Sequence, residues 1–234
     1  MISEMFAHGF IQRAFIGGVL VSLCAALLGV SLVLKRYSMI GDGLSHVSFG
    51  ALSIAIAFGF APIKFSIPIV IIAAFFLLRL AENGKMKSDA AIAMVSASSL
   101  AIGVIVTSLT TGLSTDVCSY MFGSILAMSK DDVIFSVVLS VVVLIMFGFC
   151  YHRIFAVTFD ESFSKATGVK VGMYNTLISI FTAVTVVLGI KMMGAMLISS
   201  LIIFPALTSM RVFKSFLSVT ICSAILAVIN FTAG

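Results

Sequence analysis

Eight long apolar runs with almost no charge inside them divide this 234-residue chain and constrain its fold more than any other feature. A helix needs about 20 mainly apolar residues to cross the hydrocarbon core of a bilayer. Hydrophobic residues make up 61% of the chain and charged residues 10%, whereas soluble domains carry about 45–50% and about 25%. The sequence therefore predicts an all-α polytopic membrane protein, one domain over residues 1–234 with about eight transmembrane helices. The runs cover residues 11–34, 47–60, 65–80, 90–109, 133–151, 171–190, 192–210 and 215–231.

The second run, residues 47–60, is short. It is long enough to span only if its helix begins inside the preceding stretch, residues 41–46. The segment 110–132 is mixed, and its apolar part, residues 120–128, is too short to cross. A polar loop over residues 152–170 is the longest interruption between spans.

The basic residues lie mostly between the apolar runs, where an excess of Lys and Arg marks the cytoplasmic side. The net charge of +5 is therefore assigned to membrane topology and not to nucleic-acid binding. If the 152–170 loop is cytoplasmic, the inner side holds Lys35, Arg36, Arg79, Lys85, Lys87, Arg153, Lys165, Lys170, Arg211 and Lys214, and the outer side holds Arg13, Lys64, Lys130 and Lys191. This distribution predicts an outward N-terminus. No cleavable signal is recognised, so the first span is expected to be retained.

Signatures of catalysis and of structural metal sites are missing from the sequence. The four cysteines show no CxxC spacing, and neither H-E-x-x-H nor G-x-S-x-G occurs. Gly84-Lys85 lacks the other residues of a Walker A motif. We therefore expect that the chain is not an enzyme and that ATP chemistry belongs to another chain. Met192, Met193 and Met196 are interpreted as helix packing and not as a copper path.

The stretch 41–46 places an acidic residue and a histidine at the mouth of a short span. Asp42 and His46 lie four residues apart, so on a helix they share one face. A carboxylate near membrane depth marks a functional site, and a mixed oxygen and nitrogen pair suits Zn²⁺, Mn²⁺ or Fe²⁺. Gly41 and Gly43 would let the backbone bend or unwind at such a site. The alternative is that Asp42 only caps a helix, and the spacing leaves both interpretations open.

A short helix is predicted inside the polar loop. Asp160 is a good N-cap, Glu161 complements the helix dipole, and Gly168 is a typical residue just after a helix end. Phe163 and Ala166 lie three residues apart and would share an apolar face. Such a helix could lie on the membrane or dock into a groove of a partner.

Four segments, in order along the chain, resemble motifs of the permeases of zinc, manganese and iron ABC transporters, the ABC-3 family. The first is Gly41-Asp-Gly-Leu-Ser-His-Val-Ser, and the second is Gly194-Ala-Met-Leu-Ile-Ser-Ser-Leu-Ile-Ile-Phe-Pro-Ala-Leu-Thr-Ser. The segment from Phe159 to Gly168 is similar to the coupling helix of that family, and Tyr120-Met-Phe-Gly-Ser-Ile-Leu is similar to its stretch before the fifth span.

The resemblance implies a type II ABC importer in the inner membrane of a bacterium, most like a zinc permease subunit. It implies a homodimer of permeases, cytoplasmic ATP-binding subunits and an extracytoplasmic metal-binding protein, with no permanently bound cofactor. Asp42 and His46 would line the path of the transported metal. Contact with the ATP-binding subunits is implied for Asp160, Glu161, Ser162, Phe163, Ala166 and Gly168, and helix packing or gating for Gly41, Gly43, Gly194 and Pro205. Family members usually continue with a further hydrophobic segment, so this chain is expected to lack its C-terminal part.

Three other interpretations stay open from the residues. A secondary transporter could use Asp42 as a proton site and would need no ATPase. An intramembrane metalloenzyme would need a third ligand at membrane depth, but the remaining histidines, His8 and His152, lie in loops. Export instead of import is disfavoured only by the resemblance. The residues do not choose between zinc, manganese and iron.

Overall fold

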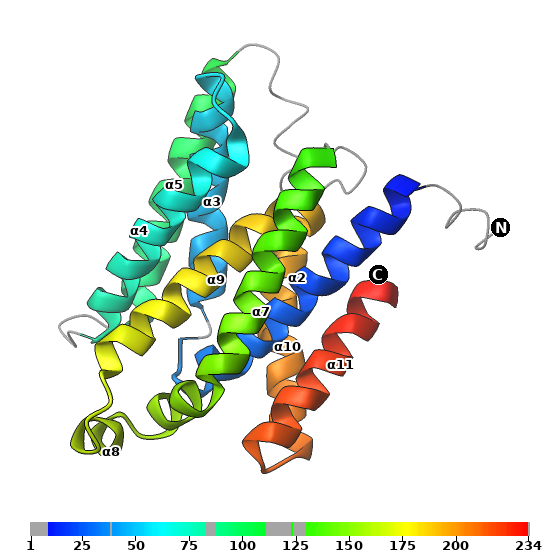
Figure 1. Ribbon diagram of the computed structural model, residues 1–234. Helices are drawn as coiled ribbons and strands as arrows, with labels where there is room; N and C mark the ends of the chain where they lie inside the picture. Colours follow the sequence, from blue (N-terminus) through cyan, green and yellow to red (C-terminus); the bar gives the residue numbers. More distant parts are fainter. Residues whose placement is uncertain (1–8, 38, 83–87, 111–122, 124–129, 234) are drawn as a thin grey trace.

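A computed structural model describes residues 9–37, 39–82, 88–110, 123 and 130–233, and these residues form a bundle of helices (Figure 1). The apolar run 120–128 and the motif that begins at Tyr120 lie outside the described residues, except for Gly123. In chain order the helices are α2 (Gly9–Leu34), α3 (Ile40–Ala57), α4 (Pro62–Glu82), α5 (Ser88–Leu109), α7 (Lys130–Phe159), α8 (Glu161–Ala166), α9 (Val171–Met193), α10 (Ala195–Val212) and α11 (Phe216–Ala233).

The long helices alternate in direction, as spans of a polytopic protein must. Seven helices in the described part of the chain are long and apolar enough to cross a membrane, namely α2, α3, α5, α7, α9, α10 and α11. The apolar stretch of α4 is shorter and covers Pro62–Leu77. Both ends of the described chain lie at the end of the bundle opposite α8 (Figure 1). The prediction of an all-α polytopic fold is therefore confirmed.

Three helix boundaries in the structure differ from those predicted from the sequence. The helix that carries Asp42 begins at Ile40, one residue before the 41–46 stretch, and it contains the whole stretch, which gives it the length to span. Helix α7 continues to Phe159 through residues predicted as loop, because Ile154, Phe155 and Val157 extend its apolar pattern without a helix breaker. Helix α9 continues past Lys191 to Met193, and the chain turns only at Gly194, whose φ is +85°.

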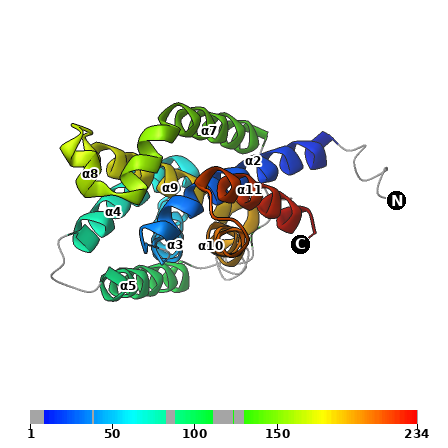
Figure 2. The ribbon, with the colours of Figure 1, turned by 90° about the horizontal axis from the view of Figure 1, so that it is seen from below.

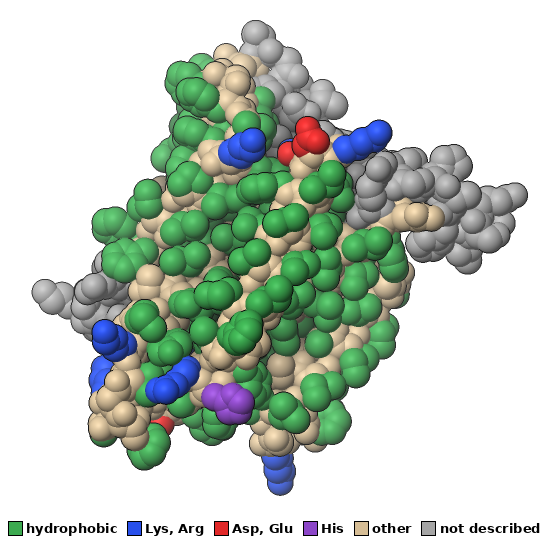
Figure 3. Space-filling view, in the orientation of Figure 1, with side chains coloured by type: hydrophobic (Ala, Val, Ile, Leu, Met, Phe, Trp, Pro, Cys, Tyr) green, Lys and Arg blue, Asp and Glu red, His purple; other side chains and the backbone are tan. Residues whose placement is uncertain are grey.

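Helix α9 is the centre of the bundle. Its residues from Phe181 to Ile190 are all buried, and α2, α3, α4, α7 and α10 pack around it (Figure 2). The outward faces of α5, α7 and α11 carry exposed apolar side chains such as Ile105, Phe149 and Ile225. Apolar side chains cover the middle of the face in Figure 3, with charged side chains at its two ends. This distribution fits a surface that faces lipid between two aqueous layers.

Helices α2 and α10 approach closely at a glycine. A Cβ atom built on Gly29 would lie 2.0 Å from the backbone oxygen of Ile202, and backbone cannot move aside as a flexible side chain can. Small residues allow this kind of contact between helices in lipid. The α2–α10 contact matters for the site described below because α10 forms one of its walls.

We expect Gly29→Ala to destabilise the protein by about 1–3 kcal/mol, the usual cost of overpacking a tight interior. Gly148→Ala is the matched control, because a Cβ atom on Gly148 of α7 has no neighbour within 4 Å. That change should be neutral or stabilising by about 0.5–1 kcal/mol, since alanine favours a helix over glycine. Thermal unfolding in detergent measures both variants, and equal melting temperatures would contradict the close contact.

Candidate functional site

Asp42 and His46 lie on one face of α3, one turn apart. The Nε2 atom of His46 is 3.8 Å from the Oδ2 atom of Asp42, and the two side chains are 26% and 44% exposed. Asp42 does not cap the helix: the N-cap position is Met39, and no side chain hydrogen bonds there. The capping alternative is therefore wrong. Asp42 instead sits in the first turn of α3, where the positive end of the helix dipole favours a carboxylate.

The pair opens into a pocket of about 140 Å³ between α3, α5 and α10. The residues that line this pocket are Asp42, Ser45, His46, Phe49, Leu100, Ala195 and Met196. Gly41, next to Asp42, packs against Ile202, and Ile202 lies near the middle of α10. The first turn of α3 therefore packs against α10, and the Asp42 carboxylate faces a pocket that the first residues of α10 also line.

The two glycines around Asp42 serve helix contact in this structure. Helix α3 is regular through both of them, so the expected bend or unwinding is absent here. A Cβ atom on Gly43 would lie 2.6 Å from Cγ2 of Ile92 in α5, and one on Gly41 would lie 3.1 Å from Cδ1 of Ile202 in α10. A side chain on Gly43 would force the Ile92 side chain to shift, and one on Gly41 would press against the Cδ1 atom of Ile202. A gating role for these glycines remains a prediction.

The second motif forms the sharp connection between α9 and α10. Gly194 joins the two helices with a positive φ, a conformation that side-chain-bearing residues rarely adopt. Pro205 lies buried inside α10, and the Ser209 hydroxyl donates a hydrogen bond of 2.7 Å to the Pro205 carbonyl. This connection sets the position of Ala195 and Met196 in the pocket wall.

Asp42 and His46 can offer a metal ion one oxygen and one nitrogen ligand, and this role remains a prediction. Among the described residues, no group of three or more His, Cys, Asp or Glu side chains gathers to hold a metal ion. A pair that is partly open to a pocket suits a passing ion better than a structural metal, which needs a closed shell of about four ligands. The sequence interpretation assigned Met196 to helix packing, whereas this residue is 60% exposed and lines the pocket. Its place in the second motif was the signal that could have linked it to the site.

The short helix in the polar loop is the predicted one. Helix α8 begins after Asp160, whose Oδ1 accepts a hydrogen bond of 2.9 Å from the Phe163 N–H. The helix ends before Gly168, whose φ is +81°. Asp160, Ser162, Phe163 and Ala166 are exposed, with 63% of Phe163 accessible. An apolar ring on a helix at the end of the bundle can bind a partner, and that role remains a prediction.

Glu161 ties α8 to the bundle. Its Oε1 accepts hydrogen bonds from Lys35 Nζ at 2.8 Å and from Asn175 Nδ2 at 3.1 Å. Partial burial acts to raise the pKa of the Glu161 carboxyl, but these hydrogen bonds and the charges of Lys35 and Lys165 outweigh burial and lower the pKa. The sequence interpretation assigned Glu161 to the helix dipole and to contact with a partner, but not to Lys35, because no local pattern links residues 126 positions apart.

This lowered pKa predicts how the α8 attachment depends on pH. A carboxyl with a lower pKa in the folded state contributes stability above its unfolded pKa and loses it as the pH falls through the folded pKa. We expect the protection of the α8 amides from hydrogen exchange to be constant near neutral pH and to fall below the ordinary carboxyl pKa. In Glu161→Gln that acid-dependent step should disappear, and an unchanged step would contradict the assignment.

The spanning helices, with a carboxylate and an imidazole facing a pocket between them, define a polytopic membrane protein with a polar pocket inside its bundle. By sequence comparison the chain belongs to the ABC 3 transport family, whose model matches residues 7–234. The high-affinity zinc uptake system membrane protein ZnuB of Buchnera aphidicola is 31% identical over 221 residues, which are 94% of this chain and 84% of that protein. The manganese import system permease protein ScaB of Streptococcus gordonii is 28% identical over 93% of this chain and 78% of its own length.

A solved structure supports the same fold. PsaBC from Streptococcus pneumoniae, determined in complex with Fab, matches with a TM-score of 0.84 at 27% identity, over 98% of this chain and 84% of that chain. The family resemblance and the multi-pass membrane location predicted from the sequence are confirmed by these comparisons.

Proposed function

We propose that this chain is the membrane-spanning permease subunit of an ATP-driven importer for a divalent transition-metal ion, with zinc as the main substrate. The observation that carries the proposal is the Asp42–His46 pair, 3.8 Å apart in a pocket between spanning helices. The similarity to a zinc uptake protein and to a manganese import permease supports the same class of substrate. Manganese or iron is the alternative cargo, because one carboxylate and one imidazole suit all three ions.

The proposal includes the partner subunits that would complete the transporter. A second permease subunit would complete the translocation path, and the exposed fraction of Asp42 leaves room for ligands from that subunit or from water. Cytoplasmic ATP-binding subunits would hydrolyse ATP, since the permease itself carries no nucleotide motif and would not act as an enzyme. They would dock on α8, whose exposed Phe163 suits a partner's groove. An extracytoplasmic protein would deliver the metal to the opposite end.

Uptake by the reconstituted complex tests this proposal. The permease, co-purified with its ATP-binding subunit, is placed in vesicles, and zinc accumulation is measured with ATP, with a non-hydrolysable analogue and with a proton gradient alone. We expect accumulation only with ATP. Accumulation driven by the proton gradient without ATP would favour a secondary transporter instead, and manganese accumulation exceeding that of zinc at equal concentration would correct the cargo.

A further inference from the structure

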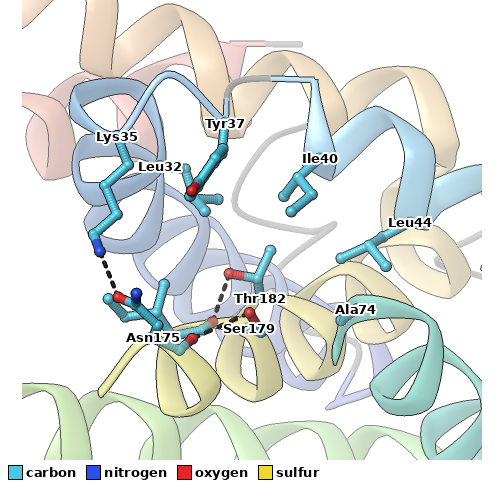
Figure 4. A pocket seen from close by; sticks show the side chains of 10 residues that line it. Leu32, Lys35, Tyr37, Ile40, Leu44, Ala74, Asn175, Ser179 and Thr182 are labelled. Atoms are coloured by element: carbon cyan, nitrogen blue, oxygen red, sulfur yellow. Dashed lines mark hydrogen bonds between the residues drawn. The ribbon is translucent and has the colours of Figure 1, made fainter. Parts of the chain in front are cut away.

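The end of α2 carries a lysine that is almost completely buried and bound to two other helices. The Lys35 side chain is 6% exposed. Its Nζ donates a hydrogen bond of 2.8 Å to Glu161 of α8 and a second, short one to Asn175 of α9. Figure 4 shows Lys35 reaching down from the end of α2 toward Asn175. Because Asn175 also donates to Glu161, each of the three residues is bonded to the other two.

Stability alone is a poor explanation for this network. The Glu161 side chain is 39% exposed, and an ion pair that is partly open to water adds little stability because water screens its charges. The network joins three separate helices at one point, and one of them, α8, has few other anchors: Ser164 is its one buried residue. Lys35 and Asn175 therefore form a firm attachment between α8 and the bundle, and movement of α8 is transmitted to the end of α2.

Lys35 is also the first residue of the connection that leads to the metal-binding pair. Only residues 35–39 separate the end of α2 from the start of α3. Hydrogen bonds fix both ends of this connection: the Tyr37 N–H donates to the Leu32 carbonyl at 2.8 Å, and the Ile40 N–H donates to the Tyr37 carbonyl at 3.0 Å. A displacement of Lys35 therefore reaches the first turn of α3, where Asp42 lies.

The backbone of the connection has one feature that is typical of a moving part. Arg36 has a φ of +61°, a left-handed conformation that costs energy for any residue except glycine and clusters at switch regions. A small cavity lies directly under the connection, lined by Lys35, Tyr37, Ile40, Leu44 and Asn175 among others (Figure 4). The cavity holds only about 10 Å³, so the first turn of α3 packs closely against Lys35 and Asn175 across it.

We propose that Lys35 is a positioning residue that couples the α8 helix to the Asp42–His46 pair. Movement of α8 by an ATP-binding subunit pulls on Lys35 through Glu161 and Asn175, and the 35–39 connection passes the movement to the first turn of α3. The distance between the two metal ligands and the α10 wall changes as a result. This role rests on the proposed function, because it assigns the link between ATP hydrolysis and metal release.

The ratio of zinc transported to ATP hydrolysed tests the link. In vesicles that contain the whole transporter, both rates are measured on the same sample for wild type, Lys35→Met and Glu161→Gln. Methionine keeps the length and the apolar stem of Lys35 but removes the charge. We expect the ratio of zinc to ATP to fall at least fivefold in both variants. Lys170, an exposed lysine between α8 and α9, is the control, and Lys170→Met should keep the wild-type ratio.

The outcomes separate the two proposals. If wild type shows no ATP-dependent zinc uptake, the proposed function fails. If wild type transports zinc and Lys35→Met keeps its ratio of zinc to ATP, the coupling role of Lys35 fails and the function stands. Should Lys35→Met not assemble with the ATP-binding subunit, Glu161→Gln decides between the same two results. A network that only stabilises the fold would lower both rates together and leave the ratio unchanged, which also overturns the role.

Discussion

Replacing Asp42 with Asn is expected to reduce zinc uptake by the reconstituted transporter by at least about tenfold. Even residues that only orient metal ligands change affinity by about 10–100-fold when they are replaced, and Asp42 is a direct ligand in the proposed site. Asparagine keeps the size of the side chain and one carbonyl oxygen but removes the negative charge. His46, whose Nε2 atom lies 3.8 Å from Oδ2 of Asp42, then loses its negatively charged partner. Zinc accumulation against time measures the effect.

A second carboxylate on a spanning helix provides the control. Asp131 is exposed in the first turn of α7, and it does not line the pocket. Asp131→Asn makes the same chemical change and should keep wild-type uptake. Both proteins are compared by thermal unfolding, so that a folding defect is separated from loss of a ligand. Wild-type uptake with unchanged ion selectivity in Asp42→Asn would remove Asp42 from the transport path.

The long apolar runs and the residues typical of helix ends allowed much of this fold to be predicted from the sequence. Length and apolarity marked the spans, and short-range chemistry marked α8: Asp160 caps it and Gly168 ends it, both as expected. Asp42 and His46 were brought together by helical spacing alone. These features depend on residues within four positions of one another, and such interactions are readable from a sequence.

The features that escaped prediction depend on contacts between distant residues. Met196 joins the Asp42 pocket because α10 packs beside α3, and Lys35 meets Glu161 because α2 and α8 end at the same level. A helix-capping role for Asp42 stayed open because the start of α3 could not be located from the sequence. Its true start at Ile40 is set by the connection from α2 and by close packing of Gly41 and Gly43. A single sequence holds no direct record of such contacts.

The second large effect is expected at Phe163, the exposed apolar residue of α8. Its ring is 63% exposed on a helix that projects from the end of the bundle, which is costly in water and typical of an anchor that fills a pocket of a partner. Phe163→Ala should weaken binding of the ATP-binding subunit by about 2 kcal/mol or more, the usual size of a central anchor. That loss corresponds to roughly thirtyfold in the dissociation constant. Binding is measured by titrating the purified subunit onto permease in lipid nanodiscs.

Phe213 is the matched control for this experiment. It is a phenylalanine that is 41% exposed at the same end of the bundle as α8, at the end of α10 (Figure 1). Phe213→Ala should bind the ATP-binding subunit as wild type does, because it lies outside the helix that is proposed to dock. If Phe163→Ala also binds normally, α8 is not the docking element. The movement that is proposed to reach Lys35 through its hydrogen bond to Glu161 would then lose its source, and the coupling role of Lys35 would fail with it.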